Sequence, residues 1–356
     1  MKNKKSIAFF EVEEWEKKYL KNKLKNFKIY FFNNILEKKD IKKIKGINIL
    51  SSFVYSKIDK DIIRKLPFLK LITTRSTGFD HLDLKEIRKN KIKVTNVPFY
   101  GENTVAEHTF ALILSLTRKI HKTYERTSRG NFDLEGLRGF DLKDKTIGII
   151  GAGHIGQHVI RIAKGFEMNI LVFDSIKDIK LSKKLGFKYT TFNNLLKNSD
   201  IISLHVPYNK KTHHLINRKN IKLIKNRSII INTSRGGLID TTALLDGLRN
   251  NKLWGIGLDV LEEEKFIIKE EKQLLSPHVC GLNHKNKKEC LQSIVEGHTL
   301  LSSNKVIITP HNAFNSQEAL ERILDTTINN ILDFENKNKL KNLIKLNIFL
   351  KVIFYF

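Results

Sequence analysis

Three groups of polar side chains follow directly on apolar stretches that have the length and composition of β-strands. The groups are 232–237, with Arg235, then 259–264, with three glutamates, and 309–312, with His311. A guanidinium binds a carboxylate through two parallel hydrogen bonds, and a histidine gives and takes a proton near neutral pH. A carboxylate beside such a histidine raises its pKa and orients the ring. Because ligands of open α/β sheets lie beyond the carboxyl ends of the strands, the three groups predict one site.

A glycine-rich turn follows the apolar strand expected over 146–150. Its glycines have the spacing G-x-G-x-x-G, and a helical pattern begins inside it. The first glycine of such a turn permits the tight bend, the second lets the backbone approach a pyrophosphate, and the third lets the helix pack against the strand. Free amides at the helix N-terminus then face the phosphates. The pattern therefore predicts dinucleotide contacts by Gly151, Gly153, His154, Ile155 and Gly156.

An acidic residue stands where the ribose of a dinucleotide is expected. Asp174 follows the next expected strand, 169–173, and lies 23 residues after Gly151. A carboxylate at this point accepts hydrogen bonds from the ribose hydroxyls and repels a 2′-phosphate. The sequence therefore predicts NAD rather than NADP as the cofactor, although Lys177 nearby weakens the repulsion.

Short apolar strands alternate with helical patterns along most of the chain. The strands are rich in β-branched residues and almost continuously apolar, which is typical of parallel sheets covered by helices on both faces. A chain of 356 residues is expected to form about two domains. The expected strands are 6–10, 47–55, 69–73, 146–150, 169–173, 201–206, 228–232, 255–260 and 306–309, and the expected helices include 104–120, 154–166, 241–251 and 316–334.

The motifs, taken in order, resemble those of the D-isomer specific 2-hydroxyacid dehydrogenases. They are Arg75–His81, Asn96–Tyr100, Asn103–His108, the glycine turn, His205–Pro207, Asn232–Asp240, Gly257–Val260 and Thr309–His311. The resemblance implies an α/β fold of two Rossmann-like domains with parallel sheets. A flavodoxin-like substrate domain would comprise 1–101 and 311–340, an NAD-binding domain would comprise 102–310, and a hinged cleft would lie at the seam. The apolar tail 341–356 has no counterpart in the family.

The resemblance also implies roles for individual residues. Arg235 would bind the substrate carboxylate and polarise the carbonyl group, and His311 would be the general acid and base. Glu264 would pair with His311, because it lies five residues after Asp259. Asp259 would contact the nicotinamide carboxamide. The other implied substrate contacts are Thr77, Gly78, Tyr100 and Tyr55, and the other implied cofactor contacts are Val206, Pro207, Thr233 and Ser234.

The family resemblance implies an enzyme that moves a hydride between NADH and a small 2-keto acid. Tyr100 and the stretch 311–315 are similar to the D-lactate dehydrogenase branch, and Tyr55 stands where that branch has a substrate-side tyrosine. A core tyrosine is the alternative interpretation of Tyr55. Pyruvate and D-lactate are the expected pair. Glyoxylate, hydroxypyruvate, phosphoglycerate and branched 2-keto acids are alternatives, as is an NAD(H)-sensing binding protein on the same fold. The resemblance further implies a homodimer.

Two departures from the family pattern concern the acid–base pair. Glu264 is followed by Lys265 rather than by the proline of many relatives, and Glu262 and Glu263 are alternative partners for His311. In addition, His311 lies 47 residues after Glu264, a longer interval than in most relatives, and the interval contains Ser-Pro-His at 276–278, a pattern similar to that of 309–311. His311 is preferred over His278 because a strand is expected before it and an amphipathic helix after it.

The segment 265–304 is polar and rich in lysine, and we expect it to be an irregular insertion. It contains two histidines and two cysteines whose spacing matches no standard zinc site: His278, Cys280, His284 and Cys290. The mechanism above needs no Lewis acid, because arginine and histidine supply the same functions. The sequence therefore predicts no metal.

Charge and cysteine content limit the partners and the compartment. Lysine and arginine number 64 against 37 acidic residues, which gives a net charge of +27. The lysines are scattered rather than gathered into a patch, so no nucleic-acid partner is expected. Two cysteines do not make a disulfide framework, which predicts a reducing, cytoplasmic location. No apolar run reaches the roughly 18 residues of a membrane span.

Overall fold

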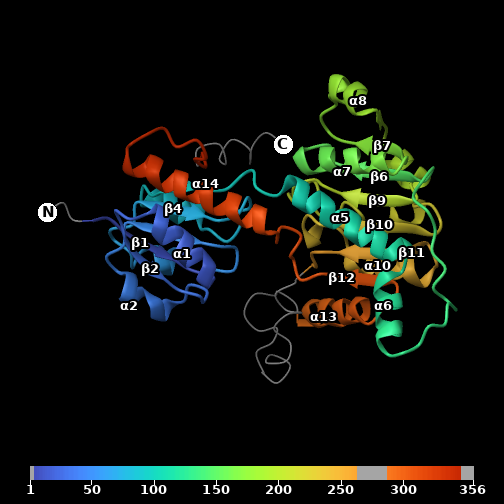
Figure 1. Cartoon of the computed structure of the whole chain (residues 1–356), viewed down its shortest axis with the longest axis horizontal. Helices are drawn as coiled ribbons and strands as arrows, with labels where there is room; N and C mark the ends of the chain where they lie inside the picture. The colour runs from blue at the N-terminus through green and yellow to red at the C-terminus, as the bar shows by residue number, and fades with distance from the viewer. Residues whose placement is uncertain (1–3, 263–286, 346–356) are drawn as a thin grey trace. The chain divides into compact units, whose positions relative to one another are not determined.

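The structure is a computed structural model that describes residues 4–262 and 287–345. The chain divides into two compact units (Figure 1). Unit 1 comprises residues 1–100 and 316–356, and unit 2 comprises residues 101–315. Each unit is built on a sheet whose strands are all parallel, as the near-continuous apolar strands predict. The predicted α/β class with two parallel sheets is thus confirmed.

Unit 1 has a five-stranded sheet in the order β2-β1-β3-β4-β5, which is the strand order of flavodoxin-like folds. The strands are β1 (Ser6–Phe9), β2 (Lys28–Phe31), β3 (Ile49–Ser52), β4 (Leu71–Thr74) and β5 (Lys93–Thr95). The helices are α1 (Glu14–Lys23), η1 (Lys38–Asp40), α2 (Ile41–Ile44), α3 (Lys60–Ile63), α4 (Leu84–Lys89) and α14 (Gln317–Glu335).

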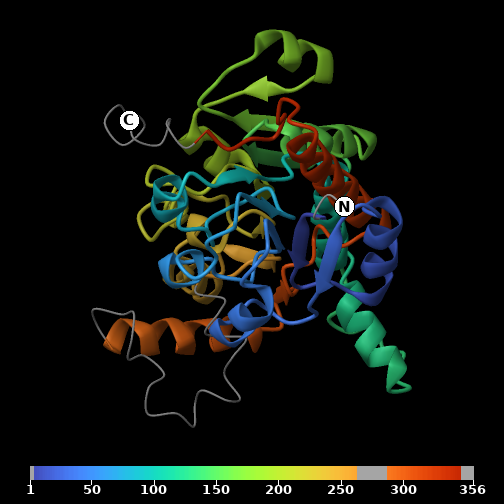
Figure 2. The same ribbon diagram turned by 90° about the vertical axis from the view of Figure 1, so that its left-hand side faces the viewer.

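Alternate residues of β1 supply the two cores of unit 1. Ile7 and Phe9 are fully buried in a cluster with residues of α1 and α14, whereas Ala8 and Phe10 belong to the cluster on the opposite face. This alternation follows from the period of two along a strand. Helix α14, which is drawn in red, lies beside α1 and over β4 (Figures 1 and 2). The C-terminal part of the chain therefore completes the core of the N-terminal part.

Unit 2 has a seven-stranded sheet in the order β12-β11-β10-β9-β6-β7-β8. The strands are β6 (Thr146–Ile150), β7 (Asn169–Phe173), β8 (Lys188–Tyr189), β9 (Ile201–Leu204), β10 (Ser228–Asn232), β11 (Leu253–Leu258) and β12 (Val306–Ile308). The helices are α5 (Glu102–Thr117), α6 (Ile120–Ser128), α7 (His154–Gly165), α8 (Ile179–Leu185), α9 (Phe192–Asn198), η2 (Ile221–Leu223), η3 (Gly236–Leu238), α10 (Thr241–Arg249) and α13 (Lys287–Leu301).

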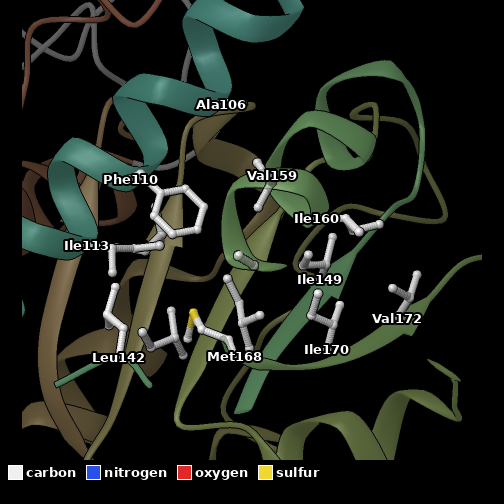
Figure 3. Packing of buried hydrophobic residues seen from close by; sticks show 14 of the residues in the cluster. Ala106, Phe110, Ile113, Leu142, Ile149, Val159, Ile160, Met168, Ile170 and Val172 are labelled. Carbon is white, nitrogen blue, oxygen red and sulfur yellow. The ribbon is translucent and has the colours of Figure 1, made fainter. Parts of the chain in front are cut away.

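Helices α5 and α7 cover one face of the unit 2 sheet. Phe110 and Ile113 of α5 meet Val159 of α7 above Ile149 of β6 in a fully apolar cluster (Figure 3). The other face is covered by α9 and α10. This packing holds the carboxyl ends of β6, β9, β10, β11 and β12 at one edge of the sheet. The glycine turn and the loops that carry His205, Arg235, Asp259 and His311 begin at this edge.

The structure differs from the sequence-based expectation in two places. The strands β2, β5 and β8 were not expected, because they are short strands at the edges of their sheets, and β2 and β8 have partly exposed side chains. The expectation of an irregular insertion over 265–304 is wrong for its last part, which forms α13. Leu300 of α13 is buried, and the helix packs on α10 and β12. A helix needs only one buried face, so this segment forms a helix although its composition is polar.

Candidate active site

The glycine turn after β6 has a backbone that larger residues would not adopt. Gly151 has a φ of 99°, and a Cβ placed there would lie 2.7 Å from the carbonyl oxygen of His205. A Cβ on Gly156 would lie 2.0 Å from the carbonyl oxygen of Gly151, so only glycine lets α7 pack this closely. Around Gly153, by contrast, a Cβ would meet no atom within 4 Å. The turn thus leaves open space at the N-terminus of α7, where amides attract a phosphate.

Asp174 connects the end of β7 to this turn. One carboxylate oxygen accepts the amide N–H of Ala152 at 2.7 Å, and the other accepts the amide N–H of Ile176 at 3.0 Å. These bonds fix a half-buried carboxylate beside the glycine turn. The turn and the carboxylate together fit a dinucleotide, with the pyrophosphate at α7 and a ribose at Asp174.

His205 follows β9 and lies against the glycine turn through its carbonyl group. Its Nε2 lies 2.8 Å from the hydroxyl of Ser203, and its Nδ1 is buried with no hydrogen-bond partner among the described residues. Burial lowers the pKa of His205 to about 3, so the imidazole is neutral at physiological pH. The next residues, Val206 and Pro207, are the predicted cofactor contacts, and a Cβ on Gly151 would lie 2.9 Å from Val206.

The loop that carries Arg235 is held by its own side chains and by its glycines. The Asn232 side chain accepts the amide N–H of Ser234 at 3.0 Å and donates to the carbonyl of Arg235 at 2.9 Å. The hydroxyl of Ser234 donates to Leu204 of β9 at 2.8 Å. The guanidinium uses one N–H on the carbonyl of Ser234, at 2.7 Å. Arginine has five N–H donors, so a carboxylate ligand can use others.

The predicted cofactor contact Thr233 lies in the same loop. It is buried, and its hydroxyl is 3.1 Å from the hydroxyl of Thr109 on α5. A Cβ on Gly236 would lie 2.1 Å from backbone atoms of Leu261, so the loop after β10 touches the loop after β11. The Arg235 loop is therefore supported by α5, β9 and the loop after β11.

Asp259 is a buried carboxylate at the end of β11 that binds the loop after β12. Its oxygens accept the amide N–H groups of Asn312 and Ala313, each at 2.9 Å, and the hydroxyl of Thr309 at 2.6 Å. The Nε2 atom of His108, on α5, lies 3.0 Å from the Thr309 hydroxyl and 3.5 Å from Asp259. The carboxylate is 1% exposed. Asp259 thus fixes the backbone that carries His311, a function that the sequence did not predict.

His311 lies inside this fixed loop. Its φ is 54°, a left-handed backbone that is uncommon for residues other than glycine, and its amide donates to the carbonyl of Thr309 at 2.9 Å. Such a conformation persists only where the surroundings determine it, and here Asp259 bonds to the two residues that follow. The half-buried His311 side chain therefore starts from a defined backbone position.

Of the three candidate glutamates, the structure describes only Glu262. Its carboxylate lies 2.6 Å from Nε2 of His214 and accepts the hydroxyl of Thr241 at 3.1 Å. Glu262 thus already pairs with His214 and Thr241. Glu263 and Glu264 lie outside the described residues, so the pairing of Glu264 with His311 stays a prediction.

In unit 1, the predicted carboxylate-binding amides lie in a turn after β4. The hydroxyl of Thr77 donates to Val97 at 2.9 Å, and the hydroxyl of Ser76 donates to the carbonyl of Gly78 at 2.6 Å. The Asn96 side chain donates to the carbonyl of Thr77 at 2.9 Å. These bonds use the acceptors of the turn, and within residues 4–262 and 287–345 the amides of Thr77 and Gly78 donate to no protein group. The turn can therefore offer two N–H groups to an anion.

The two predicted substrate-side tyrosines also lie in unit 1. Tyr55 follows β3, and its residue is 54% exposed, which does not fit the alternative of a core tyrosine. Tyr100 accepts a hydrogen bond from Arg322 of α14 through its carbonyl, at 2.6 Å. Both lie in loops after strands of the unit 1 sheet.

Comparison with known proteins assigns the chain to a family. Residues 110–313 match the NAD-binding domain of the D-isomer specific 2-hydroxyacid dehydrogenases. The chain is 35% identical to a D-lactate dehydrogenase of Escherichia coli, over 92% of this chain and 96% of that protein. It is 36% identical to a glyoxylate reductase of Thermococcus litoralis, over 70% and 78%. The chain belongs to the D-isomer specific 2-hydroxyacid dehydrogenase family.

A solved structure extends the similarity to nearly the whole chain. The D-lactate dehydrogenase of Aquifex aeolicus, complexed with NAD and lactic acid, matches with a TM-score of 0.81 and 35% identity. The match covers 95% of this chain and 98% of that chain. The predictions of this family, of NAD as the cofactor and of an oxidoreductase acting on a CH–OH group are therefore confirmed.

Several residues that organise these dehydrogenase loops were not predicted as functional. His108 and Arg75 stand in family motifs but have no implied role, and Glu11 and His214 stand outside those motifs. Their partners are distant in sequence, so no local pattern revealed them. The only local signal was a charged residue directly after an apolar strand, as at Glu11 and Arg75.

The residues suggested for zinc fall largely outside the described chain. His278, Cys280 and His284 lie outside the described residues, and Cys290 stands in the sequence of α13. Among residues 4–262 and 287–345, no group of three metal-ligating side chains is close enough to hold an ion. Over the same residues, no helix is long and apolar enough to cross a membrane.

Proposed function

We propose that the protein is an NAD-dependent D-lactate dehydrogenase, which moves a hydride between NADH and pyruvate. The observation that carries this proposal is the adjacency of the loops after β10, β11 and β12, which are neighbours in one sheet. They bear Arg235, Asp259 and His311 respectively. The relatives include D-lactate dehydrogenases, and the similar structure from Aquifex aeolicus is complexed with NAD and lactic acid.

The roles of the residues follow from their chemistry. Bound NADH supplies the hydride. Arg235 binds the pyruvate carboxylate through two N–H groups and polarises the carbonyl oxygen, with further N–H donors from Thr77 and Gly78. His311, protonated, donates its proton to that oxygen as it becomes a hydroxyl, and it removes the proton in the reverse direction. Glu264 would pair with His311 and orient its ring.

The cofactor contacts belong to unit 2. The amides of His154 and Ile155 would bind the pyrophosphate in the open space around Gly153, and Asp174 would accept the ribose hydroxyls. The loops with Val206, Pro207, Thr233 and Ser234 would line the nicotinamide side. Asp259 already accepts three hydrogen bonds, so its main contribution in this proposal is to position His311.

Initial rates of NADH oxidation test the proposal. Purified protein is assayed with pyruvate, hydroxypyruvate, glyoxylate and 2-ketoisocaproate, with NADPH as the cofactor control. The proposal expects the highest kcat/KM with pyruvate and NADH. A preference for glyoxylate would indicate a glyoxylate reductase, like the relative from T. litoralis. NADH binding without turnover of any of the acids would favour an NAD(H)-sensing protein.

Two substitutions test the assigned roles. His311→Ala should lower kcat by roughly 100-fold or more, since general acid catalysis contributes about that factor. Arg235→Ala should also raise the KM for the keto acid, because it removes a carboxylate contact. His278→Ala is the matched control, and a loss of turnover there with normal turnover in His311→Ala would overturn the assignment.

We also propose a homodimer that forms through unit 2. Helix α6 has no buried residue, and four large apolar side chains on it and after it are 55–79% exposed: Ile120, Tyr124, Phe132 and Leu134. Exposed apolar patches of this kind mark protein interfaces. Sedimentation velocity should give a dimer for the wild type and a monomer for Tyr124→Glu combined with Phe132→Asp.

The cytoplasm is the proposed compartment. The chain has two cysteines, too few for a disulfide framework, as is usual in reducing compartments.

The scattered lysines of the chain predict no nucleic-acid partner. Duplex DNA titrated at 50 mM and 200 mM salt should therefore give no binding that falls steeply with salt.

A further inference from the structure

The side chain of Glu11 gathers the loop that carries Tyr55. Its Oε1 atom accepts the amide N–H of Tyr55 at 2.9 Å. Its Oε2 atom accepts the amide N–H of Phe53 at 3.0 Å and the hydroxyl of Ser56 at 2.5 Å. Three donors of a four-residue loop therefore converge on one carboxylate that is distant in sequence.

The backbone of Glu11 is held in an unusual conformation. Its φ is 57°, in the left-handed region that residues other than glycine rarely adopt. This bend comes directly after β1 and turns the side chain toward the neighbouring strand β3, where the Tyr55 loop begins. A strained backbone that serves a specific contact is typical of functional sites.

The carbonyl of Glu11 links the same residue to the turn of Thr77 and Gly78. The guanidinium of Arg75 donates to the carbonyls of Glu11 and Phe10, at 2.6 and 2.7 Å. Arg75 is 2% exposed, and two residues later comes Thr77, the first of the two open amides. Glu11 thus joins the Tyr55 loop to the turn that is proposed to bind the substrate carboxylate.

Tyr55 has a ring contact as well as the backbone bond to Glu11. The residue is 54% exposed, and its ring lies edge-on to Phe53 with centroids 6.2 Å apart. The backbone amides of Tyr55 and Phe53 both donate to the carboxylate of Glu11. If the carboxylate is removed, the two amides lose their acceptor and the loop samples other conformations.

We propose that Glu11 is a positioning residue for the 2-keto acid, acting through Tyr55. The inference rests on the proposed function, because it assumes that Tyr55 contacts the substrate. Glu11 holds Tyr55 beside the turn that binds the carboxylate, and it thereby sets the space left for the substrate side chain. Its loss weakens keto-acid binding and leaves hydride transfer and NADH binding, which depend on unit 2, nearly intact.

The test compares Glu11→Gln with Glu14→Gln by steady-state kinetics with pyruvate. Glutamine keeps the shape of the side chain but places an NH2 group against a backbone N–H, so the convergence on the carboxylate is lost. Glu14 is an exposed glutamate of the same unit, paired only with surface groups. We expect Glu11→Gln to raise the KM for pyruvate about tenfold, with kcat and the KM for NADH within about twofold, and Glu14→Gln to match the wild type.

A double-mutant cycle shows whether Glu11 acts through Tyr55. In a Tyr55→Ala background, Glu11→Gln should raise the KM no further, because the side chain that it positions is gone. A full tenfold effect in that background, or a normal KM in Glu11→Gln alone, would overturn the inference and leave the dehydrogenase proposal standing. A wild type that turns over none of the four acids would overturn both.

A second variant covers the case in which Glu11→Gln does not fold, as judged by its melting temperature. Ser56→Ala removes one of the three bonds to Glu11 and leaves the carboxylate in place. We expect a rise of about threefold in the KM for pyruvate and none in the KM for NADH. An unchanged KM for pyruvate in a folded Ser56→Ala protein would contradict the proposal.

Discussion

Two loops, one in each unit, are fixed by the same device. In unit 1, Glu11 follows β1 and accepts two amides and one hydroxyl from the loop after the neighbouring strand β3. In unit 2, Asp259 follows β11 and accepts two amides and one hydroxyl from the loop after the neighbouring strand β12. Each loop carries a candidate functional side chain, Tyr55 or His311. A parallel sheet thus lets a carboxylate at one strand end organise the next loop.

The two loops differ in the burial of the carboxylate and in the basic residue that lies near it. Asp259 is 1% exposed, and the residue near it is His108, whose ring nitrogen lies 3.5 Å away. Glu11 is half-buried, and Arg75 binds its carbonyl rather than its carboxylate. Because the cost of losing a hydrogen-bonded charge rises with burial, the loop of His311 should depend on its carboxylate more than the loop of Tyr55 does.

Each unit contains one of the two tryptophans, which allows the loops to be compared separately. Trp15 lies in unit 1 and Trp254 in unit 2. Urea unfolding followed by fluorescence reports on unit 1 in a Trp254→Phe background and on unit 2 in a Trp15→Phe background. The following predictions use these two backgrounds.

The largest effect is expected for Asp259→Asn. The amide places an NH2 group among three donors in a buried site, so the free energy of unfolding of unit 2 should fall by about 3–5 kcal/mol. Turnover should fall with it, because the His311 loop loses its anchor. Asp246→Asn, which breaks a surface pair with Arg218, should cost less than about 1 kcal/mol. If Asp259→Asn destabilised unit 2 less than Glu11→Gln destabilises unit 1, the ordering of the two loops by burial would be refuted.

Arg75→Met should have the next largest effect. Methionine fills part of the volume but leaves the carbonyls of Phe10 and Glu11 without a donor, so unit 1 should lose about 2–3 kcal/mol. Trp15 fluorescence in urea measures the loss. Arg64→Met removes an exposed guanidinium of the same unit and should cost less than about 1 kcal/mol. Equal losses in the two variants would mean that the buried bonds contribute little.

A third prediction concerns the pH dependence of unit 2. The folded pKa of His205 is about 3, below the value near 6.5 of an unfolded histidine. Its contribution to stability is therefore fully present above pH 6.5 and is lost as the pH falls, because only the unfolded state takes up the proton. From pH 7 to 5 the loss should reach at most about 2 kcal/mol. His205→Asn should remove this slope in the Trp15→Phe background, whereas the exposed His298→Asn should keep it.

The smallest effects are expected for the two hydroxyls that complete the carboxylate sites. Thr309→Val and Ser56→Ala each remove two hydrogen bonds, worth about 1 kcal/mol each, because Thr309 bonds to Asp259 and His108 and Ser56 bonds to Glu11 and the amide of Leu36. Thr309→Val should cost slightly more, because its carboxylate partner is the more buried of the two. A larger loss for Ser56→Ala would reverse the comparison between the loops.

The sequence alone determined the features that are local along the chain. The glycine turn and Asp174 lie within one strand–helix–strand unit, so their spacing identified the dinucleotide fingerprint. Buried strands such as β6 and β10 were predicted because their apolar residues are nearly continuous. Edge strand β2 and helix α13 were missed, because half-exposed elements carry a mixed pattern that resembles a loop.

Only the tertiary structure decided which distant residues meet. Glu11 binds a loop 42–45 residues away, and Asp259 binds residues 53 and 54 positions away. No periodicity links such pairs, because they depend on which strands lie side by side. Strand order brings β1 next to β3 and β11 next to β12, and hydrogen bonds that span only 3 Å then form between their ends. The sequence therefore predicted the candidate reacting groups, and the order of the strands determined which carboxylates hold their loops in place.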